Sequence, residues 1–230
     1  MKKPKAQQPA KVRLTYLWIS SCLFLTFTAH AQEAPTTPIA PTPVEVNAGN
    51  NRFGVQFLIT KHFSPQSKLN FFSITSFESD YDNNPENFDF ITNTQAGYEF
   101  LKHLSAVAGL SVNSKAGLTP TVGLKYLFTN REILFVLTPT YSLTETKNLQ
   151  GVLLLEYRPA LTKTLSLYSR LQSMYIYDTQ NSQHQRSYYQ LRLGTGIEKY
   201  QFGFAANLDY YGKAKILKEN YGVFLKVNFQ

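Results

Sequence analysis

The chain has 230 residues, of which 43% are hydrophobic and 17% charged, and its formal net charge is +8. This length leaves room for one domain, and outside the N-terminus no apolar run is long enough for an ordinary membrane helix. The positive charge would suggest a nucleic-acid partner, but its distribution along the chain excludes one.

The N-terminus has the three parts of an export signal. An apolar core, Leu14 to Thr28, follows a group of cations and precedes the small-residue cleavage site Ala29-His30-Ala31. We expect residues 1–31 to be removed by cleavage after Ala31. The cations are Lys2, Lys3, Lys5, Lys11 and Arg13.

Two other interpretations of this segment stay open. Ile19 to Cys22 loosely matches a lipoprotein cleavage site, although cleavage there would leave the apolar stretch Leu23 to Phe27 directly after the lipidated cysteine. The second interpretation is a signal anchor that is not cleaved, although the apolar core is short for a membrane anchor.

Removal of residues 1–31 takes five of the 23 cations and no acidic residue. The mature chain then has 18 basic and 15 acidic residues, a net charge of about +3, so we expect no nucleic-acid partner. The single cysteine, Cys22, leaves with the signal, and the exported protein would have no disulfide. Its stability must come from the fold.

The segment 32–51 is rich in Pro and Thr, with prolines at positions 35, 38, 41 and 43. Because proline interrupts regular structure, this composition predicts an extended periplasmic tether.

From Phe90 to the C-terminus the chain repeats a unit of roughly ten residues that are alternately apolar and polar or small, each closed by turn residues. This period is typical of transmembrane β-strands. In Leu104–Val112, for example, Leu104 and Leu110 share the apolar face, whereas Ser105 and Ser111 lie on the other. The clearest spans are Phe90–Phe100, Leu104–Val112, Leu118–Phe128, Ile133–Leu143, Leu149–Tyr157, Leu165–Tyr177, Ser187–Ile197, Phe202–Tyr210 and Tyr221–Phe229.

The part of residues 52–230 that precedes Phe90 is less regular. Phe53–Thr60 alternates well, whereas Phe71-Phe72 and Ile74 interrupt the alternation of Leu69–Phe77. Bacterial single-chain barrels have an even number of strands, so only one of these two segments can be counted. We therefore expect residues 52–230 to form an all-β, antiparallel transmembrane β-barrel of about 10 strands from Leu69 onward, with Phe53–Thr60 as a lead-in strand. Eight or twelve strands are the alternatives.

The connections differ in polarity, which assigns a direction to each strand. Those expected on the periplasmic side are Lys102-His103, Asn130-Arg131, Pro159–Lys163 and Lys199–Gln201. The more polar and mostly longer ones suit external loops: Asp80–Asp89, Ser114–Gly117, Thr144–Asn148, Asp178–Gln185 and Gly212–Lys218.

With these directions, the outward aromatic residues form two girdles, as expected where a barrel crosses the two membrane interfaces. The periplasmic girdle is Tyr98, Phe100, Tyr126, Phe128, Tyr157, Phe202, Phe204 and Phe229. The outer girdle is Tyr141, Tyr175, Tyr177, Tyr189, Tyr210 and Tyr221. A soluble sandwich also alternates, but nothing requires its outward aromatic residues to gather at strand ends.

The inward positions have charges of both signs. They are Glu99, Lys125, Glu132, Glu156, Arg158, Arg170, Arg192, Glu198, Asp209 and Lys226. A barrel of about 10 strands has little spare interior, so we expect these residues to form a network that fills the lumen. Arg192 and Asp209 would form an ion pair if the turn at Lys199–Gln201 is tight. The alternative is a selective water-filled pore lined by the same residues.

The sequence indicates no catalytic set, cofactor or metal site. His184 is the one histidine in an expected external loop, near Asp178 and Ser182, where a hydrolase of membrane lipid or peptide would have its site. Gly194-Thr195-Gly196 lies inside a strand, where glycine relieves crowding, and is no phosphate-binding loop.

The ending Val223 to Gln230, with Gln32-Glu33 after the cleavage site and the periodic strands, resembles that of small outer-membrane β-barrel proteins of the Bacteroidota. Gln230 departs slightly from the aromatic ending of that family. The resemblance implies a Gram-negative outer-membrane location, with outer-membrane lipid, the secretion route and the barrel-assembly machinery as partners, and it implies no site residues.

Three functional hypotheses follow from the sequence. The first is a barrel with a largely filled, mixed-charge lumen and a structural or surface-interaction role, without enzymatic activity. The second is a narrow, porin-like passive channel for small solutes or ions, and the third is a rim hydrolase. The sequence indicates neither a ligand nor an oligomeric state.

Overall fold

A computed structural model of the chain describes residues 41–82 and 84–229. These residues form a closed antiparallel β-barrel in which every strand pairs with its neighbour along the chain and β1 pairs with β12. The strands are β1 (Thr42–Gly49), β2 (Arg52–His62), β3 (Leu69–Asp80), β4 (Asp89–Leu101), β5 (Leu104–Asn113), β6 (Gly117–Thr129), β7 (Ile133–Ser142), β8 (Asn148–Tyr157), β9 (Leu165–Asp178), β10 (Gln183–Ile197), β11 (Tyr200–Tyr211) and β12 (Ile216–Phe229).

The barrel has 12 strands, so the expectation of about 10 is wrong. Phe53–Thr60 belongs to a full strand, β2, and the irregular segment around Phe71-Phe72 to another, β3. The added strand β1 occupies much of the segment expected to be a tether. Val44 and Val46 face outward in β1, whereas Glu45 and Asn47 are buried inside, so this strand has the same alternation as the others. The predicted signal and residues 32–40 of the predicted tether lie outside the described residues.

The even strand number places the beginning of β1 and the end of β12 at the same rim, where Thr42 pairs with Phe229. We call this the terminal rim, and the opposite one the far rim. The far rim has the longest of the six connections on that side, residues 81–88, which includes the 3-10 helix η1 (Pro85–Asn87). The β9–β10 and β11–β12 connections there are shorter than expected, because β10 begins at Gln183 and β12 at Ile216.

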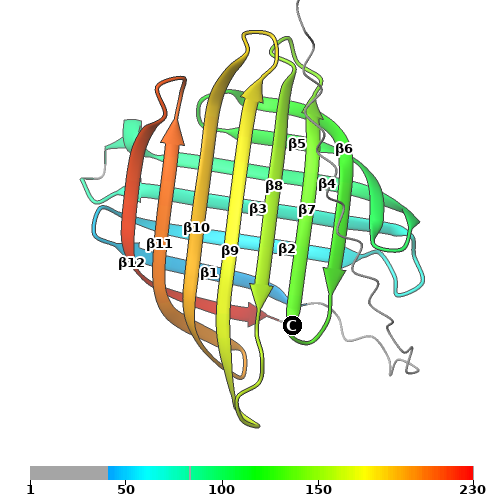
Figure 1. Cartoon of the computed structure of the whole chain (residues 1–230), viewed down its shortest axis with the longest axis vertical. Coiled ribbons are helices and arrows are strands. Elements are labelled where there is room, and N and C mark those ends of the chain that lie inside the picture. The colour runs from blue at the N-terminus through cyan, green and yellow to red at the C-terminus, as the bar shows by residue number, and fades with distance from the viewer. Residues whose placement is uncertain (1–40, 83, 230) are drawn as a thin grey trace, which may run out of the picture. The chain divides into compact units, whose positions relative to one another are not determined.

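Figure 1 shows the barrel from the side. Strands β7–β11, flanked by β6 and β12, form the nearer wall and run transverse to β1–β5 behind them, as the opposite walls of a barrel do when its strands tilt against the axis. The β9–β10 and β11–β12 hairpins of the far rim point to the top of this view. Side chains from opposite walls meet across the lumen, as Arg186 of β10 and Asp89 of β4 do.

The barrel wall is polar on its inner face and apolar on its outer face, which is the reverse of a soluble protein. The interior contains buried Glu, Arg, Lys, Asn and Gln, whereas large apolar side chains such as Phe204 (75% exposed) and Leu193 (58%) cover the outside. Apolar surface on this scale suits lipid rather than water. The chain thus has the fold of a transmembrane β-barrel.

No helix among residues 41–82 and 84–229 is long and apolar enough to cross a membrane.

Close packing of the wall explains the glycines of the predicted Gly194-Thr195-Gly196 segment. Gly194 of β10 pairs with Gly203 of β11, and a Cβ on either residue would collide with the backbone of the partner strand. The prediction that glycine relieves crowding in this strand is therefore confirmed.

Candidate functional site: the barrel interior

The carboxylate of Glu45 on β1 is a buried charged group at the centre of a hydrogen-bond network. Its Oε1 accepts hydrogen bonds from Arg170 Nη2 of β9 at 2.7 Å and from Arg192 Nε of β10 at 2.8 Å. All three side chains are almost fully buried. Since three strands separate β1 from β9 in the barrel, the Arg170 contact crosses the lumen. Charge-assisted hydrogen bonds of this length are the strong ones.

A second carboxylate, Glu78 on β3, extends this network. Asn207 of β11 accepts a hydrogen bond from Arg192 Nη1 at 2.7 Å and donates one to Glu78 Oε1 at 3.0 Å. The other oxygen of Glu78 accepts from Arg52 Nη1 of the neighbouring strand β2, also at 3.0 Å. We call these residues the central charge cluster: Glu45, Arg52, Glu78, Arg170, Arg192 and Asn207.

A smaller set of side chains joins opposite walls towards the far rim. Arg186 of β10 donates to Asp89 of β4 at 2.9 Å and to Asp209 of β11 at 3.1 Å. Its guanidinium lies over the ring of Tyr211, whose hydroxyl donates to Asp89. We call Asp89, Arg186, Asp209 and Tyr211 the rim cluster. Because β4 and β10 are diametrically opposite, Arg186 ties the two walls together.

A third group lies between β8, β9 and β12. Lys226 Nζ donates to Glu156 Oε1 at 2.5 Å and to the hydroxyl of Tyr168 at 3.1 Å, and that hydroxyl donates to the same carboxylate oxygen at 2.9 Å. All three side chains are fully buried. This lysine cluster is thus a closed triangle of hydrogen bonds.

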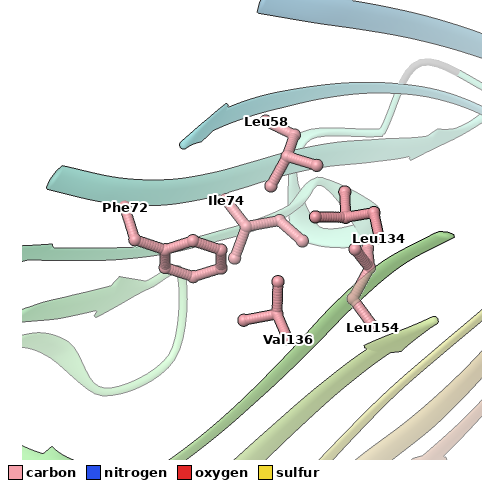
Figure 2. Close-up of a cluster of buried hydrophobic side chains, with 6 residues drawn as sticks. All are labelled: Leu58, Phe72, Ile74, Leu134, Val136 and Leu154. Carbon is pink, nitrogen blue, oxygen red and sulfur yellow. The ribbon is translucent and has the colours of Figure 1, made fainter. Parts of the chain in front are cut away.

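Apolar side chains fill another part of the interior. Figure 2 shows residues from β2 and β3 facing residues from β7 and β8. We call this group the apolar layer: Leu58, Phe72, Ile74, Leu134, Val136 and Leu154. A second apolar group joins β4, β8, β9 and β10 through Ile91, Val152, Met174, Ile176 and Tyr188. Both groups connect opposite walls by packing.

The structure distributes the predicted lumen residues unequally. The buried ones are Lys125, Glu156, Arg170, Arg192, Asp209 and Lys226. Arg158 is partly buried, with its Nη1 3.9 Å from Glu156, and Glu99 is half-buried near the terminal rim. Glu132 and Glu198 lie exposed in turns, so these two do not contribute to the interior. The turn of Glu132 ends one residue later than the expected Asn130-Arg131, and the turn of Glu198 begins one residue before the expected Lys199.

The expected ion pair between Arg192 and Asp209 is wrong. The β10–β11 turn consists of residues 198 and 199 and not of 199–201, which shifts the register. Arg192 therefore pairs with Ala205, and Asp209 with Tyr188. Arg192 instead binds Glu45, and Asp209 binds Arg186.

Sequence reasoning missed several charged residues of the interior: Glu45, Arg52, Glu78, Asp89 and Arg186. Glu45 and Arg52 lie in β1 and β2, which were not counted among the barrel strands, and Glu78 lies just beyond the expected span Leu69–Phe77 of β3. The signal that could have found Glu45 is the short alternation from Val44 to Asn47, which the neighbouring prolines obscure.

The aromatic residues predicted for the two girdles lie on the outer face. Most of them are exposed, and Phe128, Tyr177 and Tyr210 are half-buried among outward neighbours. Their depth in a bilayer stays a prediction.

The residues considered for catalysis do not form the expected set. Asp178 accepts hydrogen bonds from Gln180 and Asn181 in the β9–β10 turn, and Ser182 is exposed there. His184 contacts Ser187 and the backbone of Gly212. Within residues 41–82 and 84–229, no group of three or more His, Cys, Asp or Glu side chains could hold a metal ion.

No family model matches the sequence, and no curated protein matches it. Solved structures of similar fold include the KdgM porin (TM-score 0.44, 12% identity), the NanC porin (0.47, 10%) and LpxR from Salmonella typhimurium (0.39, 9%). The matches cover 82–83% of this chain and 99%, 99% and 100% of those proteins, respectively. Likeness at this level assigns neither a family nor a function.

Proposed function

We propose that the protein is an integral outer-membrane β-barrel whose lumen is closed by its own side chains and whose role is structural or surface-interacting. The observation that carries this proposal is the contact of opposite walls inside the barrel, above all Arg170 of β9 with Glu45 of β1. A pore needs a continuous path for water, and charged pairs and apolar side chains both occupy the space between these walls.

The membrane location rests on the two faces of the wall. Apolar side chains cover the outside, and each of the described strands β1–β12 pairs with a neighbour on both sides. We propose that the chain is exported by the secretion route and inserted by the barrel-assembly machinery, with the terminal rim in the periplasm. Heat-modifiable migration on a detergent gel tests the barrel itself. A single band that does not change on heating would contradict it.

Conductance across a planar bilayer tests the closed lumen. We expect the wild-type barrel to give no steady unitary current. Arg192→Ala removes one partner of Glu45, and Arg131→Ala, which changes an exposed turn residue, is the matched control. Steady unitary currents in the wild type that shift with Arg192→Ala but not with Arg131→Ala would overturn the proposal.

The same result would establish the second candidate, a narrow passive channel for ions or small solutes. The observation that favours it is the polarity of the interior, where buried cations and anions alternate from the rim cluster to Glu45. Rings of charged side chains set the selectivity of many pores. A channel would therefore have to open by separating contacts such as Arg186 with Asp89.

A further inference from the structure

A serine and a histidine form a hydrogen-bonded pair on the outer face of β10, outside the interior clusters. The ring Nε2 of His184 lies 3.0 Å from Ser187 Oγ, and both residues are buried. Residues three apart on a regular strand lie on opposite faces. Here the register shifts between His184 and Arg186, and this bulge brings His184 to the face of Ser187. Bulges often redirect a side chain in this way next to active sites.

The second ring nitrogen defines the tautomer of the histidine. His184 Nδ1 lies 2.7 Å from the carbonyl oxygen of Gly212, in the β11–β12 turn. A carbonyl oxygen can only accept, so Nδ1 must carry the proton in this contact. In the neutral ring Nε2 is then unprotonated and accepts from the hydroxyl of Ser187. A nucleophile, a base and a group that orients the base are thus in line, which is the arrangement that activates serine in acyl transfer.

The position of the pair in the barrel indicates the class of substrate. Ser187 pairs with Tyr175 on one side and Tyr210 on the other, and the His184 ring centroid is 5.4 Å from that of Tyr175. These tyrosines belong to the outward aromatic residues near the far rim. Tyrosine side chains on membrane barrels lie at the level of the lipid headgroups, where the acyl ester bonds of lipids are also located.

We propose that Ser187 and His184 form an acyl-transfer site for an ester of a membrane lipid, approached from the lipid side of the wall. Ser187 Oγ attacks the ester carbonyl carbon while its proton passes to His184 Nε2. The carbon–oxygen bond to the alcohol then breaks, and the alcohol leaves with that proton. Water attacks the acyl-serine in the same way and releases the fatty acid, so the net reaction is ester plus water to acid plus alcohol. This site does not depend on whether the lumen is open.

Covalent labelling with a fluorophosphonate probe tests the nucleophile in the folded, full-length barrel. We expect mass spectrometry to place the label on Ser187 of the wild type. His184→Ala should reduce the labelling rate by about 100-fold or more, because general-base catalysis contributes on that order. Ser173→Ala is the matched control, since Ser173 also lies on the outward face but pairs with Tyr189. Its labelling should equal that of the wild type.

Hydrolysis tests the substrate. Vesicles of phosphatidylethanolamine and phosphatidylglycerol containing the wild-type barrel should release free fatty acid, and Ser187→Ala should remove this release. Every variant is first checked for heat-modifiable migration, and Ser187→Cys replaces Ser187→Ala if the alanine variant does not fold. A folded wild type that is not labelled on Ser187, or fatty-acid release that is equal in wild type and Ser187→Ala, would overturn the proposal. In that case the pair only fastens the β9–β10 hairpin to the β11–β12 turn.

Discussion

The central charge cluster and the apolar layer both hold the barrel walls together, but through different kinds of interaction. Both join opposite walls, the first through hydrogen bonds to Glu45 and Glu78 and the second through packing around Val136. A charge-assisted hydrogen bond is lost when either of its two partners is removed, whereas packing distributes its stabilisation over many weak contacts. The charged part of the interior should therefore be sensitive to loss of one partner, and the apolar part to loss of volume.

The largest effect is expected for Glu45→Ala. The substitution leaves Arg170 and Arg192 buried without their carboxylate, and an unpaired buried charge costs about 4 to 5 kcal/mol of unfolding free energy. Guanidinium unfolding in detergent micelles, followed by circular dichroism, measures this loss. Glu145→Ala, in an exposed far-rim loop, should change stability by less than about 0.5 kcal/mol. Equal losses in the two variants would refute the comparison.

In the apolar layer, Leu154→Ala should cost about 3 kcal/mol, because it removes a fully buried side chain and leaves a cavity. The next residue, Leu155, faces outward and is 38% exposed, so Leu155→Ala should cost less than half as much in the same unfolding experiment. If Leu155→Ala were the more costly of the two, the layer would not be a packed core.

The rim cluster should be less sensitive than the central one. Arg186 and Asp89 are partly exposed, so water can replace part of their contact, and the buried Asp209 keeps Arg52 Nη1 at 3.9 Å, so Arg186→Ala should cost about 1 to 2 kcal/mol. Arg131→Ala provides the baseline for an exposed arginine. If Arg186→Ala lost as much unfolding free energy as Glu45→Ala, the stability contributions of the two clusters would not depend on how deeply their side chains are buried.

The smallest change is expected when a charged pair is replaced as a whole. Lys226→Met alone removes the cation hydrogen-bonded to the buried carboxylate of Glu156 and should cost about 3 kcal/mol, whereas Lys226→Met together with Glu156→Leu should change stability by less than about 1 kcal/mol. The comparison of single and double variants by chemical unfolding is the measurement. If the double variant were less stable than Lys226→Met alone, the charged pair would stabilise the barrel more than the apolar side chains that replace it.

The period of the strands was predictable because alternation is a local property. From Leu104 onward every expected span lies in a strand of the barrel, apart from Leu143 just after β7, since each one presents an apolar face to lipid and a polar or small one to the interior. β1 was not predicted because Pro41 and Pro43 obscure its few alternating residues. The irregularity of β3 also has a physical reason: Phe72 and Ile74 point inward into the apolar layer, which gives that strand two apolar faces.

The partners of the interior charges could not be predicted, because they depend on register and on contacts across the lumen. A turn of two residues rather than three changes the neighbours of Arg192 and Asp209 completely. Glu45 and Arg170 are 125 residues apart in sequence, and no local pattern relates them. The inward direction of most charges was thus accessible from sequence, whereas the network that they form was not.

The pairing of β1 with β12 differs from every other strand pairing among the described residues, because no hairpin connects the two strands. Eleven pairings can form between neighbours in sequence, but this one must bring Thr42 to Phe229. Closing so long a loop costs chain entropy before any contact offsets it. An unclosed barrel would present two free strand edges, at which chains aggregate. Closure is therefore the step at which folding of this chain competes most directly with aggregation, and the step where assistance during insertion would have its greatest value.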